Sequence, residues 1–419
     1  MMIPYKKSLI FLFCLLLTVF VQAQFRTQIF QQNIKTLQVG IQGEKFLLPV
    51  IEFGGDNIIQ IQFDEMSHES HAYTYQVVHC NADWTPSSIN SNEYLSGFTT
   101  ADITDFQLSV NTTFLYTHYN FTLPNNDMQL KLSGNYVVHV YEDNNPDKKV
   151  FDACFSIVEP KVAIQASVRG NTDTELNGKL QQLDFDVQLN GYQVKDASSE
   201  IKVLVRQNNR IDNEVRNLQP TFFSGSKLSF INNRSLIFEA GNEFHTFDIS
   251  SVYAASRGVE RVVYNQPHYD VLLTEDKVLA TKSYTPEQDV NGRFVINHQE
   301  SFDNQNLEGD YMWVHFKLAM KEPFFDGLLY LGGEFNYNQL NDAVMLRYDA
   351  NAGQYYQSVL LKQGGYNYQY RFVPKGQKSA VVGRVDGSYW QTNNEYTIYI
   401  YHRPWGERYD KLIGVKQLQ

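Results

Sequence analysis

Hydrophobic and polar residues alternate over short stretches along most of the chain, and this alternation is typical of strands. Residues 71–80 (HAYTYQVVHC), 135–143 (NYVVHVYED) and 311–320 (YMWVHFKLAM) are each rich in aromatic and β-branched side chains. Turn-forming residues, such as those at 142–147 (EDNNPD) and 363–367 (QGGYN), separate such runs. Long runs with the period of a helix are almost absent. The pattern predicts an all-β fold of tandem immunoglobulin-like β-sandwich domains.

Two seams interrupt the alternation, at residues 156–164 (SIVEPKVAI) and 283–293 (SYTPEQDVNGR). Proline and clustered polar residues cannot continue a strand ladder, so these seams suit linkers. The chain shows no fixed-period repeat, so we expect units that are similar in architecture only. The expected domains are 24–160, a first β-sandwich, 161–285, a second β-rich domain, and 286–419, a C-terminal β-sandwich.

The amino terminus has the order of a secretory signal peptide. Two lysines precede an apolar run at residues 9–21, and small residues lead to a cleavage point after Ala23. The run is shorter than the roughly 20 residues that a transmembrane helix needs, and no later segment approaches that length. We therefore expect residues 1–23 to be removed and the mature chain to be exported, without a transmembrane segment.

Charge and cysteine content narrow the possible partners. Processing removes two lysines, so 35 − 2 = 33 basic residues face 46 acidic ones, a net charge of −13. Such acidity disfavours nucleic acid and anionic lipid as partners. Cys80 and Cys154 remain, which excludes a disulfide framework. Whether these two cysteines pair stays open, because the sequence gives no Cα separation.

The candidate catalytic and metal-binding residues lack the spacing that a metal site or a catalytic nucleophile needs. His68, Glu69 and His71 could approach one ion, but nothing supplies further ligands at a recognisable distance, and a solvated turn is the favoured interpretation. His79 and Cys80 are consecutive in a predicted strand, so their side chains face opposite sides. No nucleophile elbow, phosphate loop or dinucleotide fingerprint occurs. We expect no enzymatic activity, no cofactor and no metal.

Aromatic residues suggest a different kind of function. The stretches 388–390 (SYW) and 402–410 (HRPWGERYD) could stack on sugar rings, so an exported glycan-binding module is an alternative. Aromatics in β-sandwiches more often form cores and cross-strand pairs. An outer-membrane barrel would need uniformly apolar alternate faces, which charges interrupt here.

Several long stretches resemble one known family. Residues 75–98 (YQVVHCNADWTPSSINSNEYLSGF), 103–125, 133–143 and 396–414 (YTIYIYHRPWGERYDKLIG) resemble the plug proteins of the type IX secretion system of Bacteroidota, and the resemblance covers nearly the whole mature chain. Cys154 stands where we expect an aromatic or aliphatic residue in that family. The residues that we assign to a structural family motif are His79, Cys80, Asn81, Asp83, Trp84, Pro86, Tyr94, Gly97 and Phe98.

We interpret the motif as a structural corner. The strand ends at Cys80, Asn81 and Asp83 can cap the backbone of a turn, Trp84 can cover the edge of the core, and Pro86 prevents the ladder from continuing.

The resemblance implies a periplasmic protein at the inner face of the outer membrane. Such a protein would bind the periplasmic opening of the type IX outer-membrane barrel translocon and close it, remaining peripheral to the membrane through this protein partner. The surface that faces the barrel and the trigger for release stay open. The stretch 329–373 also loosely resembles early-set immunoglobulin-like domains, which often serve only as scaffolds.

Overall fold

The computed structural model describes residues 24–172, 174–175, 178–300 and 304–419. The expected signal peptide, residues 1–23, lies outside the described residues. The prediction of an all-β protein built from sandwiches is confirmed, since antiparallel sheets dominate and the helices are single turns. In the part of the chain that the structure describes, no helix is long and apolar enough to cross a membrane.

The first unit is a sandwich of two sheets. The order of one sheet is β1-β12-β11-β5-β7 with β3 beside β12, and that of the other is β2-β4-β9-β8. A small β10-β6 ladder and the turn α2 lie at one end. The bounds are β1 (Gln28–Ile29), β2 (Ile34–Ile41), β3 (Val50–Glu52), β4 (Ile59–Glu65), β5 (Tyr73–Cys80), α2 (Ser91–Tyr94), β6 (Leu95–Gly97), β7 (Thr100–Ile103), β8 (Asp105–Leu108), β9 (Thr117–Leu123), β10 (Met128–Leu130), β11 (Gly134–Glu142) and β12 (Lys149–Val158).

The second unit combines a middle segment of the chain with its end. One sheet has the order β13-β14-β18-β17 with β19 beside β14, and the other has the order β16-β15-β30-β31. The bounds are β13 (Ala163–Arg169), β14 (Leu180–Gln188), α3 (Ala197–Glu200), β15 (Ile201–Gln207), β16 (Val215–Arg216), β17 (Phe222–Ser224), β18 (Lys227–Phe230), η1 (Arg234–Leu236), β19 (Ile237–Glu239), β30 (Tyr396–His402) and β31 (Lys411–Leu418).

The third unit lies between these two segments in the sequence. Its sheets have the orders β20-β29-β24, with β26 beside β29, and β21-β22-β25-β28-β27, with β23 beside β25. The bounds are β20 (His245–Asp248), β21 (Val259–Asn265), β22 (His268–Leu273), β23 (Asp276–Lys277), β24 (Phe294–Ile296), α4 (Gln305–Glu308), β25 (Tyr311–Ala319), β26 (Gly327–Gly332), η2 (Glu334–Asn336), β27 (Arg347–Asp349), β28 (Gln354–Lys362) and β29 (Gly364–Pro374).

The sheets do not follow the linear domain boundaries expected from the sequence. Strands β20, β22 and β23, which precede residue 285, pair with strands that follow residue 290. The hairpin β30-β31 returns from the end of the chain and pairs with β15, from Ile201↔His402 to Gln207↔Tyr396. We therefore propose three units divided by their sheets: residues 24–160, residues 161–240 together with 391–419, and residues 241–390.

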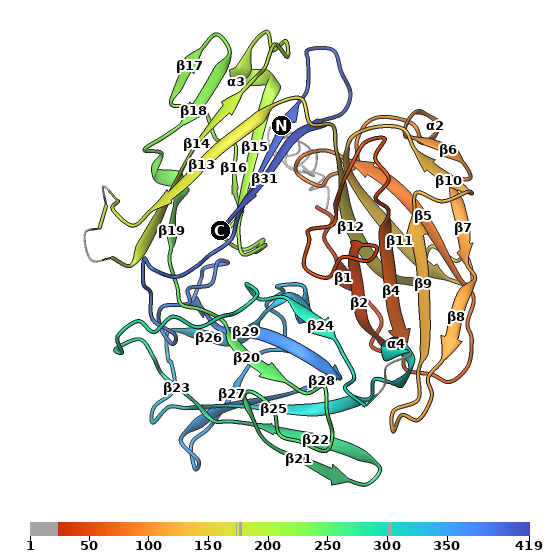
Figure 1. Cartoon of the computed structure of the whole chain (residues 1–419), viewed down its shortest axis with the longest axis vertical. Coiled ribbons are helices and arrows are strands. Elements are labelled where there is room, and N and C mark those ends of the chain that lie inside the picture. Colours follow the sequence, from red (N-terminus) through yellow and green to blue (C-terminus); the bar gives the residue numbers. More distant parts are fainter. Residues whose placement is uncertain (1–23, 173, 176–177, 301–303) are drawn as a thin grey trace, which may run out of the picture.

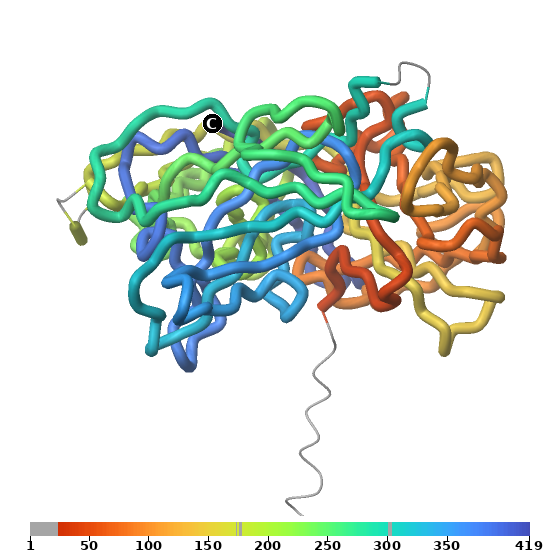
Figure 2. Tube along the Cα trace, turned by 90° about the horizontal axis from the view of Figure 1, so that it is seen from below, coloured from red at the N-terminus to blue at the C-terminus, as the bar shows by residue number. Residues whose placement is uncertain are grey.

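The three units lie around a common centre. Figure 1 shows the first unit on the right, the second at the upper left and the third along the bottom. Figure 2, seen from below, shows that the units lie side by side in one layer. Each unit has its own apolar core, filled by the inward residues of both sheets, such as Phe63, Tyr119 and Phe151 in the first. Such cores pack as densely as organic crystals and deform little.

Candidate functional site

The predicted motif forms a tight turn after β5. The backbone N–H of Asn81 donates to the carbonyl of Thr85 (2.8 Å), and Cys80 and Pro86 form a bridge across the turn. Asp83 Oδ1 accepts from the backbone N–H (3.1 Å) and the hydroxyl (2.7 Å) of Thr85. Burial would raise the pKa of Asp83, but the hydrogen bonds from Thr85 lower it below its ordinary value. The carboxylate therefore holds the turn in its ionised form.

His79 and Cys80 lie on opposite faces of the sheet. His79 is buried, and its Nε2–H donates to the carbonyl of Ser133 (3.2 Å) while Nδ1 lies 2.9 Å from Ser87 Oγ. Burial lowers the pKa of His79 to about 4, so the ring is neutral at pH 7. A Cβ on Gly134, which has a φ of 138°, would lie 2.5 Å from Nε2. The ring of His79 therefore has a structural role, and glycine at position 134 leaves the space that this ring needs.

Cys80 and Cys154 are both free and buried. They pack in one small cluster with Trp84 and Val137. Val137 on β11 is paired with Cys154 on β12, while Cys80 lies on β5, so a whole strand separates the two cysteines. Burial raises the pKa of both thiols. The thiols therefore behave as small hydrophobic groups and not as nucleophiles.

The remaining motif residues secure the neighbouring ladder or reach the surface. Tyr94 is buried, and its hydroxyl donates to the carbonyl of Val77 (3.3 Å). Gly97 has a φ of 100°, and a Cβ there would lie 2.2 Å from the carbonyl oxygen of Asp127, so only glycine fits. Phe98 is 65% exposed. The sequence did not indicate what the turn contacts.

The turn contacts the loop between β30 and β31 of the second unit. Asp410, which is fully buried, accepts from the backbone N–H of Ala82 through Oδ2 (2.8 Å). The same carboxylate accepts from Arg403 Nε (2.8 Å) and from Lys202 Nζ (2.9 Å). Arg403 also donates to the side chain of Asn81 (2.5 Å). Two positive charges and a backbone N–H thus compensate one buried carboxylate, which a buried charge requires.

A second group of polar contacts continues this joint. The hydroxyl of Tyr401 donates to Asn135 Oδ1 (2.9 Å), which also accepts from Ser156 (2.8 Å). Asn135 in turn donates to the carbonyl of Asn81 (3.0 Å). Apolar residues from both units pack around these bonds: Ala82, Val158, Leu204, Tyr399, Tyr401 and Leu412. The motif is therefore one half of an interdomain joint, which we call the motif joint.

Sequence reasoning missed the second half of the motif joint. It considered residues 402–410 for their aromatic side chains, although Arg403 and Asp410 make the buried contacts. The two tryptophans singled out in the sequence differ. Trp390 packs against the backbone at Gly170, while Trp405 is 94% exposed at the tip of the loop. The signal that could have indicated this half of the joint is the presence of opposite charges within the short, turn-rich segment 402–410.

A buried ion pair joins the first and third units. Lys362 Nζ lies 2.6 Å from Asp64 Oδ2, and both side chains are 1% exposed. The hydroxyl of Tyr311 donates to the same oxygen (2.7 Å), and His118 Nδ1 lies 2.6 Å from the other. Burial would raise the pKa of Asp64, but Lys362 and His118 lower it below its ordinary value. The ammonium group also lies 4.2 Å from the ring centre of Tyr116. We call this group the lysine joint.

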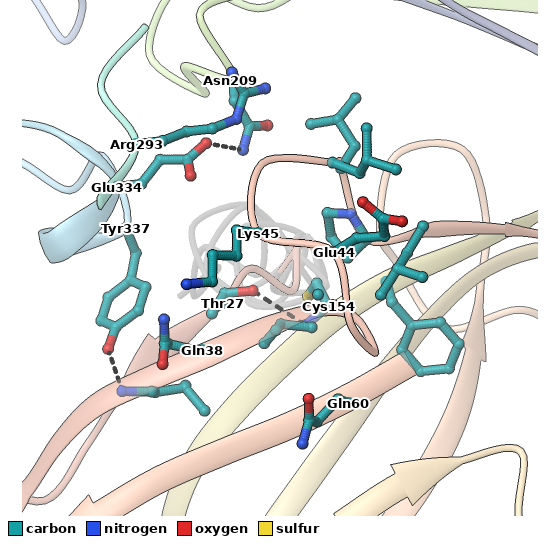
Figure 3. A pocket seen from close by; sticks show the side chains of 18 of the residues that line it. Thr27, Gln38, Glu44, Lys45, Gln60, Cys154, Asn209, Arg293, Glu334 and Tyr337 are labelled. Atoms are coloured by element: carbon teal, nitrogen blue, oxygen red, sulfur yellow. Dashed lines mark hydrogen bonds between the residues drawn. The ribbon is translucent and has the colours of Figure 1, made fainter. Parts of the chain in front are cut away.

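The second and third units meet beside a central cavity. Arg293 of the third unit pairs with Glu395 of the second, and its Nη2 donates to both carboxylate oxygens (2.7 and 2.8 Å). Asn209 donates to Glu334 (3.1 Å). The cavity has a volume of about 610 Å³ and is lined by all three units. Figure 3 shows Asn209, Glu334 and Gln38, one from each unit, around it. The charged groups of Arg293 and Glu334 are thus bound by side chains of the second unit. We therefore interpret the cavity as a space between the three units.

The histidines considered for metal binding have separate partners. His68 Nε2–H donates to the carbonyl of Ser109 (3.1 Å), whereas His71 Nδ1 lies 2.8 Å from Glu65. Among the residues that the structure describes, no group of three histidine, cysteine or acidic side chains is arranged to hold a metal ion. The contacts of His68 and His71 are therefore those of structural residues.

The fold and its joints define a class of protein: an all-β assembly in which ion pairs with buried carboxylates join the sandwich units. Residues 34–159 match the family model described as Type 9 secretion system plug protein 1st domain. The structure is similar to the crystal structure of a hypothetical protein from Parabacteroides merdae, with 43% sequence identity, a TM-score of 0.92 and coverage of 95% of this chain and 100% of that one. No curated protein matches the chain.

Residues 34–159 belong to the type IX secretion plug family, as their match to the model of its first domain shows. The resemblance seen in the sequence is thereby confirmed, and the matched segment contains every residue of the predicted structural motif.

Proposed function

We propose that this chain is a non-enzymatic periplasmic plug that binds and closes the periplasmic opening of the type IX outer-membrane barrel translocon. The observation that carries this proposal is the locking of three sandwich units into one flat body by the motif joint, the lysine joint and the Arg293–Glu395 pair. Membership of the plug family supports it.

The size and stiffness of the body suit obstruction of a wide pore. A unit of roughly 130 residues has a radius of gyration near 14 Å and is therefore about 36 Å across. Three such units side by side present a protein-sized plate (Figure 2). A plug made of loosely tethered units would let small solutes pass between them. The joints oppose this separation, because opening them breaks the hydrogen bonds and apolar contacts between units.

Closure has to be reversible if substrates are to pass. We therefore expect a polar interface of moderate size with the barrel, since large apolar interfaces are typical of permanent complexes. The net negative charge of the chain makes the strength of such an interface dependent on salt.

Affinity purification of the tagged chain from gently solubilised outer membranes tests binding. We expect a very large barrel protein to co-purify in near-equal amounts while export is idle, and less of it during active export. The proposal would be refuted if the chain were recovered only in the free periplasmic fraction, both when export runs and when it is stalled. If the chain stayed bound to the barrel at raised salt throughout active export, the expected release during export would be refuted.

Uptake of a small dye normally excluded by the outer membrane tests closure separately. Cells that lack the protein should take up more dye, and cells with Lys362→Met should still retain the barrel contact but leak, because the lysine joint is loosened. Lys375→Met is the matched control, since it removes the same charge from an exposed turn. Equal dye exclusion with and without the protein would contradict closure.

A further inference from the structure

The sheet β21-β22-β25-β28-β27 has an outer face that points away from the other two units (Figure 1). Along β25 the inward residues are fully buried, while Trp313 is 40% exposed and His315 and Lys317 are half-buried. The outer face is hollowed by an open groove of about 720 Å³. That volume is in the range of ligand sites. Residues lining the groove include Arg261, Asp270, His315, Lys317, Tyr356 and Ser358.

A chain of hydrogen bonds crosses three adjacent strands at the centre of the groove. Asp270 Oδ1 lies 2.7 Å from His315 Nε2, and His315 Nδ1 lies 2.7 Å from Ser358 Oγ. Burial would raise the pKa of Asp270, but the hydrogen bonds from His315 and Asn265 lower it. Because the carboxylate accepts Nε2–H, Nδ1 of a neutral ring accepts the serine proton. The free lone pairs of Ser358 Oγ are then left to accept from a ligand hydroxyl.

The same three residue types can perform nucleophilic catalysis, but this arrangement lacks a further requirement. Acyl transfer needs N–H donors beside the nucleophile to stabilise an oxyanion. The backbone N–H of Ser358 donates instead to the side chain of Gln357 (3.0 Å). The neighbouring strand residues have backbone groups committed to the pairing of β25 with β28. The hydrogen-bonded chain therefore suits recognition of hydroxyl groups, and not hydrolysis.

Two aromatic side chains flank this polar centre. Trp313 lies two residues from His315 on β25, and Tyr356 lies two residues from Ser358 on β28, where it is opposite Lys317. Both aromatic side chains are 40% exposed. From the strand rise and spacing, their Cα atoms are about 14 Å apart on the same face. Two separated aromatic platforms with hydroxyl acceptors between them match an extended ligand with alternating apolar and polar faces.

The chemistry of the face favours a saccharide over a peptide or a polyanion. A sheet face offers only side chains, whereas an added peptide strand needs the backbone groups of a sheet edge. Arg261 and Lys317 are offset in the groove by Asp270 and Asp349, so it carries no excess of positive charge. Sugar rings present C–H faces to aromatic rings and hydroxyls to groups such as serine and histidine.

We propose that the outer face of this sheet binds a neutral oligosaccharide, with Trp313 and Tyr356 as stacking platforms and Ser358, oriented through His315 and Asp270, as a hydroxyl acceptor. This site is independent of the plug role, since it uses a different surface and needs no barrel.

Isothermal titration calorimetry of the mature chain with chitohexaose, cellohexaose and maltohexaose tests the proposal. We expect heat of binding with at least one of them. Trp313→Ala and Tyr356→Ala should each weaken that binding at least ten-fold, and Ser358→Ala should weaken it several-fold. Trp405→Ala is the matched control: it removes an exposed tryptophan from the second unit and should leave binding unchanged.

Urea unfolding of each variant separates lost binding from lost folding, and Tyr356→Ala carries the test if Trp313→Ala does not fold. The proposal is overturned if none of the three hexasaccharides gives heat, or if folded Trp313→Ala and Tyr356→Ala bind as the unaltered chain does. Binding of heparin alone would identify a polyanion site instead. Covalent labelling of Ser358 by a fluorophosphonate would show a nucleophile and would also overturn it.

Discussion

Replacing Lys362 by methionine should loosen the first unit from the third. The ammonium group is 1% exposed, lies 2.6 Å from Asp64 and donates to the carbonyl of Asn306 (2.6 Å). Methionine keeps most of the volume but removes the charge. Asp64 is then left buried with hydrogen bonds from Tyr311 and His118 only.

The expected loss follows from the unpaired carboxylate. Removing one partner of a buried ion pair costs about 3–5 kcal/mol. Replacing both charges, as in Asp64→Asn with Lys362→Met, removes the penalty of the isolated charge. The double variant should therefore be more stable than the sum of the two single changes predicts, by about 1–3 kcal/mol of coupling.

The loss should also depend on pH. In the folded protein the pKa of Asp64 is lowered, so its contribution is fully present above the unfolded value of about 3.9 and is lost as pH falls through the folded value. Without Lys362 the pKa of Asp64 rises, and protonation then relieves the buried charge. The stability difference between Lys362→Met and the unaltered chain should shrink as the pH is lowered from 7 toward 4.

Urea unfolding followed by fluorescence measures these free energies, and amide hydrogen exchange locates the loosening. We expect faster exchange at β4 and β28, which carry Asp64 and Lys362, before global unfolding. Additive losses in the double variant, or a deficit that is the same at every pH, would refute the reasoning. Lys375→Met, at an exposed position, controls for loss of a lysine.

Three further outcomes are expected. Trp84→Ala should cost about 3–5 kcal/mol of unfolding free energy in urea, because the side chain is 8% exposed within the cluster of Cys80 and Cys154; a loss under 1 kcal/mol would contradict this. The pKa of His79 falls from 6.5 to about 4 on folding. The stabilisation that the neutral ring provides should therefore be complete above pH 6.5, and up to about 3 kcal/mol of it should be lost as the pH falls to 4. His79→Gln, measured in parallel, should lack this pH dependence. Gly97→Ala should lower the melting temperature, since its Cβ meets a carbonyl oxygen, and an unchanged temperature would show that the turn can shift.

The strand content could be read from the sequence because it is a local property. The alternation in residues 71–80 places Tyr73, Tyr75 and Val77 on one buried face, and the structure has a strand there. The turn after Cys80 was also readable, since Asn81 and Asp83 belong to residue types that bond to nearby backbone groups. Family membership was readable for a different reason, because long ordered stretches carry it.

The pairing of distant segments could not be read from local patterns. The alternation at residues 396–402 predicts a strand, but nothing in it indicates that β30 pairs with β15, almost two hundred residues earlier. A strand can pair with any compatible edge, and the chosen edge depends on how the other units pack. The expected boundary near residue 285 was drawn from a proline-containing seam, although the sheets cross it.

The sequence by itself therefore determined the strands, the turn chemistry and the family. The tertiary structure alone decided that Asp410 lies against Ala82, that Lys362 lies against Asp64, and that Asp270, His315 and Ser358 form one line. A charged residue carries the same local signal whether it ends in water or in a buried pair. Which of these it becomes depends on long-range packing, because only a partner brought close from another segment can compensate the cost of burial.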